Sequence, residues 1–327
     1  MPVDPEILRI YEAMKEGGPS PFRRRSIEQI RSDAVDAVAR VWSEVGLPIP
    51  EVTLTRQTVP VDGWPDVDIR IHRPPGVDRA LPAVISFFGG AFRQGSNDFA
   101  VNRWMYAQRA IDAEVVVVAV DYAQAPEHRF PTPIEQGLAV LDRIVEEGGQ
   151  LGIDTRRLAV SGQSSGGTIA ACIAQANLDR RRHPLRLQLL EVSLLDLTGK
   201  HAVLGAVKPL GVPRWFMRRD VRKTVRNYLG NTVKPTAPEV SPLLRENLEG
   251  LPPAVILAAE FDALRGDAAA YHARLREAGV MSSATIALGQ THDSAGFVGV
   301  LEAARIWHRT AVGALRTLHD PVSADAE

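Results

Sequence analysis

A serine lies between two glycines in a segment suited to a sharp turn from a strand to a helix. The apolar run RLAV leads into Gly-Gln-Ser-Ser-Gly at residues 162–166, and a helical pattern follows. Small residues two positions before and after the serine permit such a turn, and the helix N-terminus favours negative charge beside it. This context predicts Ser164 as a nucleophile, whereas the five residues alone would be a common glycine-serine turn.

The serine hydroxyl needs a base in contact with it and an acid that orients the base. For this type of turn the chain order is serine, acid, histidine, and each partner follows a strand. Asp262 and His292 each follow an apolar run in that order. Asp267 and His272 lie within a helical pattern and are expected to be structural. The sequence therefore predicts Ser164, Asp262 and His292 as nucleophile, acid and base.

Acyl transfer also needs N–H donors for the negative charge that develops on the carbonyl oxygen. The usual donors are the residue after the nucleophile and a residue in the loop after the third strand. Those positions are Ser165 and the glycines Gly89 and Gly90, whose missing Cβ atoms let the backbone approach a substrate. We interpret the three as an oxyanion hole, with a plain strand-ending turn as the competing interpretation.

The composition is that of a folded, soluble protein. The chain has 327 residues, of which 45% are hydrophobic and 24% charged, with a formal net charge of −1. This balance gives no field for a nucleic acid, and no apolar run is long enough to span a membrane, so we expect a cytoplasmic location. The single cysteine, Cys172, excludes an internal disulfide and any multi-cysteine metal site, and it is expected to be buried on a helix.

Short apolar, β-branched runs alternate with helical patterns along the chain. They occupy residues 82–88, 114–122, 157–162, 185–195, 253–260 and 282–289. Such an order predicts an α/β protein with a mostly parallel sheet covered on both faces. Two earlier stretches, EVTLTRQTVP and DVDIRIHRP, alternate polar and apolar residues around a turn, which predicts an antiparallel sheet edge.

Two helical segments stand outside this alternation. We expect N-terminal cap helices in residues 1–50 and a cap insertion in residues 197–240, packed together as a lid. The remaining residues, 51–196 and 241–327, would form the catalytic domain.

Several longer segments resemble the hormone-sensitive-lipase-like esterases, also called bacterial family IV, of the α/β-hydrolase superfamily. They are DYAQAPEHRFPTP, LGIDTRRLAVSGQSSGG, SPLLRENLEGLPPA and EFDALRGDAAAYHARLREAGV. The resemblance covers most of the chain. It implies the α/β-hydrolase fold, with an eight-stranded, mostly parallel sheet, helices on both faces and a helical cap. It also implies hydrolysis of short acyl esters without a metal or cofactor.

Three positions depart from the pattern of that family. Phe88 stands where the family has the histidine of its His-Gly-Gly-Gly loop, and Gln163 replaces an aspartate beside the nucleophile. Asp293 replaces a small or apolar residue after the catalytic histidine. No catalytic group is lost. We expect Phe88 and Gln163 to border the substrate and Asp293 to perturb His292 or to face solvent.

The predicted cap insertion is rich in positive charge. Against Asp220 alone, residues 208–226 contain Lys208, Arg214, Arg218, Arg219, Arg222, Lys223 and Arg226. One interpretation is a solvated helix face, and the other is attraction of an anionic substrate or carrier protein. Trp215 and Phe216 lie in the same segment, where they would line the acyl pocket or pack within the lid.

These residues predict a metal-independent serine hydrolase that cleaves a short-chain carboxylic ester or acyl group through an acyl-enzyme on Ser164. One alternative is a biosynthetic deacetylase, acyltransferase or cyclase that uses the same triad. The other is a ligand-binding protein without catalysis. The expected partner is a small-molecule acyl substrate, with no nucleic acid, membrane or cofactor, and the expected state is a monomer or homodimer.

Overall fold

The computed structural model describes residues 2–15 and 26–321. Residues 1 and 16–25 of the predicted N-terminal cap, and 322–327 of the predicted catalytic domain, lie outside the described residues. The strands are β1 (Thr53–Val59), β2 (Val67–Arg73), β3 (Leu81–Phe87), β4 (Val116–Val120), β5 (Ile153–Gln163), β6 (Leu185–Glu191), β7 (Ala254–Phe261) and β8 (Ser282–Thr291). The helices are α1 (Pro5–Lys15), α2 (Ile27–Val45), α3 (Ala100–Ala113), α4 (Thr132–Glu147), α5 (Ser165–Arg180), α6 (Arg214–Leu229), α7 (Arg265–Glu277) and α8 (Glu302–Arg316).

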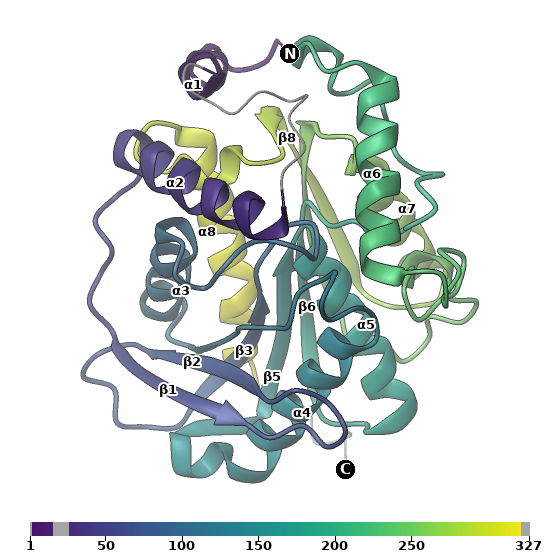
Figure 1. The fold of residues 1–327 in the computed structure, drawn as a ribbon. Coiled ribbons are helices and arrows are strands. Elements are labelled where there is room, and N and C mark those ends of the chain that lie inside the picture. The colour runs from purple at the N-terminus through teal and green to yellow at the C-terminus, as the bar shows by residue number, and fades with distance from the viewer. Residues whose placement is uncertain (1, 16–25, 322–327) are drawn as a thin grey trace.

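The eight strands form one sheet in the order β1-β2-β4-β3-β5-β6-β7-β8. β1 and β2 pair antiparallel, as do β2 and β4, while every pairing from β4 to β8 is parallel (Figure 1). The mostly parallel sheet with an antiparallel edge was predicted from the sequence and is confirmed. Because parallel strands end at the same edge, the loops after β3, β5, β7 and β8 meet there.

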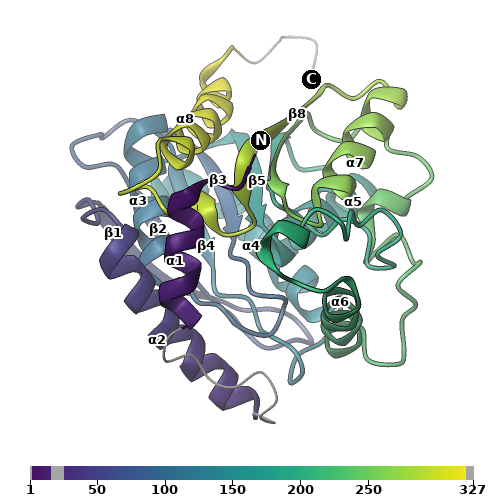
Figure 2. The same ribbon diagram turned by 90° about the horizontal axis from the view of Figure 1, so that it is seen from above.

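Helices cover both faces of the sheet, so its central strands are apolar throughout. Along β4, Val116, Val118 and Val120 belong to one buried cluster and Val117 and Ala119 to the other. The first cluster also includes apolar residues of α4, α5 and α7, and the second includes residues of α1, α3 and α8. Figure 2 shows these two groups of helices on opposite sides of the strands. The position of Cys172, on α5 and buried, is as expected.

The N-terminal helices and α6 flank the same end of the sheet (Figures 1 and 2). They meet through the loop after β3. The Arg31 guanidinium of α2 donates to the backbone oxygen of Arg93 at 3.0 Å, and the Arg93 side chain lies 3.7 Å from Asp220 on α6. Both segments are therefore attached to one loop beside the strand ends.

Two predicted strand boundaries differ from the structure by four residues, more than any of the others. The strand predicted at residues 185–195 ends at Glu191, because Val192 adopts a left-handed backbone with φ 43° and the chain leaves the sheet. β5 begins at Ile153, earlier than predicted, because Ile153 pairs with Leu81 before a register shift. Among the described helices, none is both long and apolar enough to cross a membrane.

Candidate active site

Ser164 lies in the turn between the end of β5 and the start of α5. Its backbone has φ 52° and ψ −119°, an unusual conformation for a residue with a side chain. Its N–H donates to the backbone oxygen of Glu191 at 2.9 Å, which attaches the turn to the end of β6. A Cβ at Gly162 would collide with the backbone of Gly166. The glycines therefore let the turn close and present the serine beside a helix N-terminus.

The three residues predicted as nucleophile, base and acid lie in one hydrogen-bonded row. His292 Nε2 lies 3.0 Å from Ser164 Oγ, and His292 Nδ1 lies 2.7 Å from Asp262 Oδ2. Asp262 is buried and also accepts the N–H of Leu264 at 2.9 Å through its other carboxylate oxygen. This second bond fixes the carboxylate, which in turn orients the imidazole. The row has the connectivity by which a histidine removes a proton from a serine hydroxyl.

The charge state of His292 is set by competing influences. Burial lowers the pKa of the imidazole, but the charge and hydrogen bond of Asp262 and the charge of Asp293 raise it, to about 9. Asp293 is exposed, so it acts on His292 through space. The sequence left open whether Asp293 perturbs the histidine or faces solvent, and the side chain does both.

The candidate oxyanion loop approaches the nucleophile closely. A Cβ placed on Gly89 would lie 3.2 Å from the Cβ of Ser164 and 3.1 Å from the backbone oxygen of Gln163. Gly90 has φ +145°, and a Cβ there would collide with the backbone oxygen of Gln94. Ser165 is the first residue of α5 and adjoins the nucleophile. Gly89 and Ser165 therefore adjoin Ser164, and Gly90, the next residue of the loop, has a backbone conformation that requires glycine.

Phe88, predicted to border the substrate, instead belongs to the core. The side chain is fully buried and stacks on Tyr122, with ring centroids 4.3 Å apart and planes at 21°. The Tyr122 hydroxyl donates to the backbone oxygen of Phe88 at 2.9 Å. Tyr122 therefore holds the start of the loop after β3 in place. The apolar ring of Phe88 fills a buried space at the position where the resembled family has histidine.

The other residues predicted to bind substrate differ in their surroundings. Gln163 is partly buried, and its amide nitrogen lies 3.2 Å from the sulfur of Met105. Trp215 and Phe216 lie in the first turn of α6 with exposed fractions of 65% and 43%, and their rings form an edge-to-face pair. Trp215 lines a cavity along α6 to which no triad residue contributes.

A buried ion pair beneath the nucleophile was not anticipated from the sequence. Arg109 of α3 donates two hydrogen bonds, of 2.7 and 2.8 Å, to the carboxylate of Glu191, which also accepts the Trp307 indole N–H at 2.6 Å. Both charged residues are buried. The backbone oxygen of Glu191 accepts the Ser164 N–H, so this network also fixes the backbone of Ser164. Its only sequence signal was one glutamate at the end of an apolar run.

Asp267 has a structural position, as the sequence suggested. One of its carboxylate oxygens accepts the backbone N–H groups of Leu195 and Asp196, both at 2.9 Å. Burial raises the pKa of this carboxyl to about 7, although the two backbone donors oppose the shift. Asp267 therefore joins α7 to the segment after β6 and does not contact the triad base. In the described part of the chain, no three His, Cys, Asp or Glu side chains form a group suited to a metal ion.

Comparison with known proteins identifies the relatives of this chain. A family model described as the alpha/beta hydrolase fold matches residues 84–296. The esterase LipI of Mycobacterium tuberculosis is 34% identical over 324 residues, which cover 97% of this chain and 95% of LipI. The ethyl acetate hydrolase of Pseudomonas putida is 30% identical, with 93% of this chain and 95% of that enzyme covered.

Solved structures agree with the sequence comparison. A thermostable esterase from Pseudomonas putida superposes with a TM-score of 0.87 at 27% identity, covering 98% of this chain and 99% of that one. A hyperthermophilic esterase from the archaeon Pyrobaculum calidifontis gives a TM-score of 0.86 at 26% identity, with 97% and 99% covered.

Proposed function

This chain belongs to the alpha/beta hydrolase fold family, among its hormone-sensitive-lipase-like esterases, and from that premise we propose that Ser164 cleaves short-chain esters through an acyl-enzyme. That the chain is a carboxylic ester hydrolase follows from its relatives, whose substrates are small-molecule esters. The assignment of residues is ours. Its main support is the unbroken row of hydrogen bonds from Asp262 through His292 to Ser164.

In the proposed cycle, Ser164 Oγ attacks the ester carbonyl while His292 Nε2 accepts the hydroxyl proton. His292 then gives this proton to the leaving oxygen as the carbon–oxygen bond breaks. Water attacks the acyl-enzyme in the second half, with His292 again as base, and releases the carboxylic acid. Asp262 holds the imidazole and stabilises its charged form.

The N–H groups of Gly89, Gly90 and Ser165 would stabilise the oxyanion of each tetrahedral intermediate. The support is the close approach of Gly89 to Ser164, the place of Ser165 directly after it, and the φ of +145° that requires glycine at residue 90. Such donors act strongly because they are already oriented when the charge develops. Gln163 would border the acyl group from the other side of the nucleophile.

The N-terminal helices and α6 would form the cap. Both are attached to the loop after β3, and α6 also packs on that loop through Phe92 and Tyr228, whose rings stack with centroids 3.8 Å apart. In this arrangement the first turn of α6 would bring Trp215 and Phe216 toward the acyl chain.

Turnover of p-nitrophenyl esters from acetyl to dodecanoyl tests the proposal, with wild type compared with Ser164→Ala. A fluorophosphonate probe and intact-mass detection report whether Ser164 becomes covalently labelled. We expect labelling and turnover of the shorter esters by wild type and neither by the variant. Labelling without turnover would indicate an acyl acceptor other than water, and turnover that survives Ser164→Ala would refute the assignment.

A further inference from the structure

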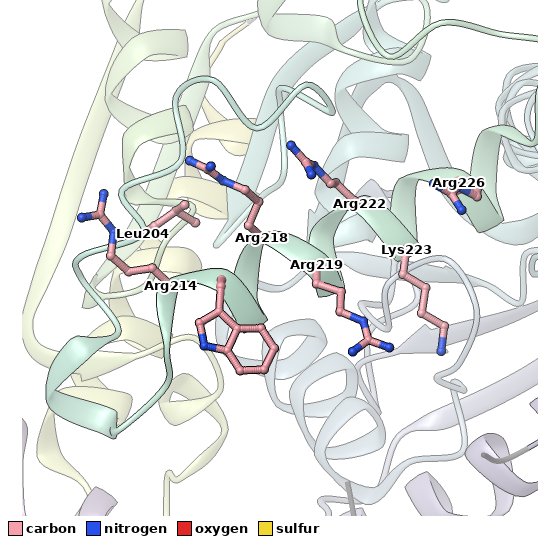
Figure 3. A pocket seen from close by; sticks show the side chains of 8 residues that line it. Leu204, Arg214, Arg218, Arg219, Arg222, Lys223 and Arg226 are labelled. Carbon is pink, nitrogen blue, oxygen red and sulfur yellow. The ribbon is translucent and has the colours of Figure 1, made fainter. Parts of the chain in front are cut away.

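A cavity of about 830 Å³ lies along α6. Six of the residues that line it are cationic: Arg214, Arg218, Arg219, Arg222, Lys223 and Arg226. Figure 3 shows Arg214, Arg218 and Arg222 extending from one side of the helix, toward Leu204, and Arg219 and Lys223 from the other. The cavity is half open, and the side chains that line it carry mainly guanidinium and ammonium groups.

These cations have no ion-pair partner among the residues that the structure describes. Across the described ranges, 2–15 and 26–321, none of the six forms an ion pair or donates a side-chain hydrogen bond. The acidic residue of the helix, Asp220, lies nearest Arg93 in the loop after β3. Like charges three and four residues apart on a helix repel one another. Solvent and salt screen this repulsion between exposed side chains in part, and a bound anion would neutralise it directly.

The spacing of the cations fits an anion with several charges. Residues four apart on a helix have Cβ atoms about 5–6 Å from each other, so Arg214, Arg218 and Arg222 form a row of donors. Guanidinium groups bind phosphate oxygens in pairs of hydrogen bonds. A single carboxylate would neutralise one cation of six, whereas a diphosphate engages adjacent ones. The volume falls in the range of small-molecule sites, about 300–1,000 Å³, so the cavity has room for a small ligand.

The cavity adjoins the catalytic loops through two contacts. The N–H of Val203 donates to the backbone oxygen of Ala263 at 2.8 Å, and Ala263 directly follows Asp262 in the chain. Leu204, which follows Val203, lines the cavity. On the other side, Tyr228 of α6 stacks on Phe92 of the loop after β3. The cavity is therefore linked through Val203 and Leu204 to the loop that holds Asp262, and α6 itself packs on the loop after β3.

We propose that the α6 cavity binds the phosphate groups of the acyl donor, an ester or thioester whose leaving group carries a diphosphate. This inference rests on the proposed function. Ser164 Oγ bonds to the carbonyl carbon, and the carbon–oxygen or carbon–sulfur bond breaks. The leaving group departs as an alcohol or thiol with the proton that His292 took from Ser164. Water then releases the acyl group as a carboxylic acid.

Binding is tested by calorimetric titration of the full chain with inorganic diphosphate, for wild type and Ser164→Ala. We expect both to bind, and binding to weaken as salt is raised because the charges are exposed. The double variant Arg218→Gln and Arg222→Gln should bind at least about tenfold more weakly, since it loses charge-assisted hydrogen bonds. Arg40→Gln with Arg56→Gln, two exposed arginines outside the cavity, removes the same charge and should bind as wild type does.

Kinetics distinguish a leaving-group site from a separate anion site. Acetyl-coenzyme A and S-acetyl-N-acetylcysteamine share the thioester, but only the first carries a diphosphate. We expect wild type to favour acetyl-coenzyme A in kcat/KM, and the Arg218/Arg222 variant to lower this ratio about tenfold. Diphosphate binding without any such preference would overturn the proposal.

Each remaining outcome has one meaning. Failure of diphosphate to bind an enzyme that hydrolyses p-nitrophenyl esters would overturn the inference and leave the proposed function intact. An equal loss of binding in the Arg40/Arg56 pair would also overturn it, because net charge alone would then explain the effect. Diphosphate binding by a wild type that hydrolyses no ester would refute the proposed function instead.

Discussion

Arginine serves opposite purposes in two regions of this molecule. Behind the nucleophile, Arg109 is buried and its guanidinium is paired with Glu191 through two short hydrogen bonds. Along α6, Arg218 and Arg222 are exposed and unpaired within the described protein. A charge neutralised inside the protein fixes the backbone around it, whereas a charge left without a partner is free to bind something else. The region behind Ser164 is thus held by internal contacts, whereas α6 presents cations that the described protein does not pair.

The largest effect should come from Ser164→Ala, which separates the two regions functionally. Removal of the hydroxyl should lower kcat by at least about 10⁴-fold, because the triad works as a unit. Stopped assays with p-nitrophenyl acetate measure this loss. The variant should keep the diphosphate affinity of wild type, and a parallel fall in that affinity would show that the two regions are not independent.

Arg109→Leu should break the buried region at its charge pair. Glu191 would remain as a buried carboxylate without its cation, and loss of one partner of such a pair costs about 3–5 kcal/mol in the free energy of unfolding. Thermal and urea unfolding measure the change. Arg222→Leu is the matched control on α6, where the effect should stay within about 0.5 kcal/mol.

The double variant Arg109→Leu with Glu191→Leu sharpens this test. Removing both charges leaves no unpaired charge, and only the Trp307 indole N–H loses its acceptor, so much of the lost stability should return. A double variant as unstable as Arg109→Leu alone would show that this region is stabilised by the packing of the two side chains and not by their charges.

Glycine to alanine substitutions add one methyl group and can compare the loop beside Ser164 with the segment that precedes α6. Gly90→Ala places a Cβ against the backbone oxygen of Gln94 at φ +145°, so the loop must move and the oxyanion donors with it. We expect kcat to fall by about 10²–10³-fold, as for loss of an oxyanion donor. Gly205→Ala in the cap meets no described atom within 4 Å and should change kcat little. Similar kcat losses in both variants would argue against the oxyanion assignment.

The smallest effect concerns pH. The pKa of His292 is raised to about 9, so the imidazole is protonated below that pH and cannot accept the Ser164 proton. kcat/KM should therefore rise with pH and level off above about 9. Asp293→Asn removes a charge that raises this pKa, so the midpoint should move to lower pH. A midpoint that stays in place would mean that Asp293 does not act on His292.

The sequence predicted the order of elements well and the supporting contacts poorly. All eight strands were anticipated, because buried parallel strands are apolar runs that stand out between helices. The order of Ser164, Asp262 and His292 followed from the same topology, since each residue comes directly after a strand. Local sequence patterns were therefore enough to predict the order of the elements and of these three residues, although they give no distances between them in the fold.

What the sequence missed depends on side chains that meet across the fold. Arg109, Glu191 and Trp307 come from three separate elements, and no spacing along the chain indicates their contact. The prediction that Phe88 borders the substrate was wrong for a related reason. It rested on the two loop glycines that follow Phe88, whereas the ring of Tyr122 holds the Phe88 side chain in the core. The unpaired state of the α6 cations could likewise be recognised only once the positions of all described carboxylates were known.

The tight glycine packing around the nucleophile bears on how such an enzyme can diverge. A methyl group at Gly166 would strike the backbone oxygens of Phe87 and Phe88, and one at Gly89 would press on Ser164. Single substitutions at these glycines are therefore expected to displace Ser164 before they can alter what the enzyme accepts. Replacement of the exposed side chains of α6 would leave this packing intact, so we expect a protein with this fold to be able to keep one reaction while its substrates change.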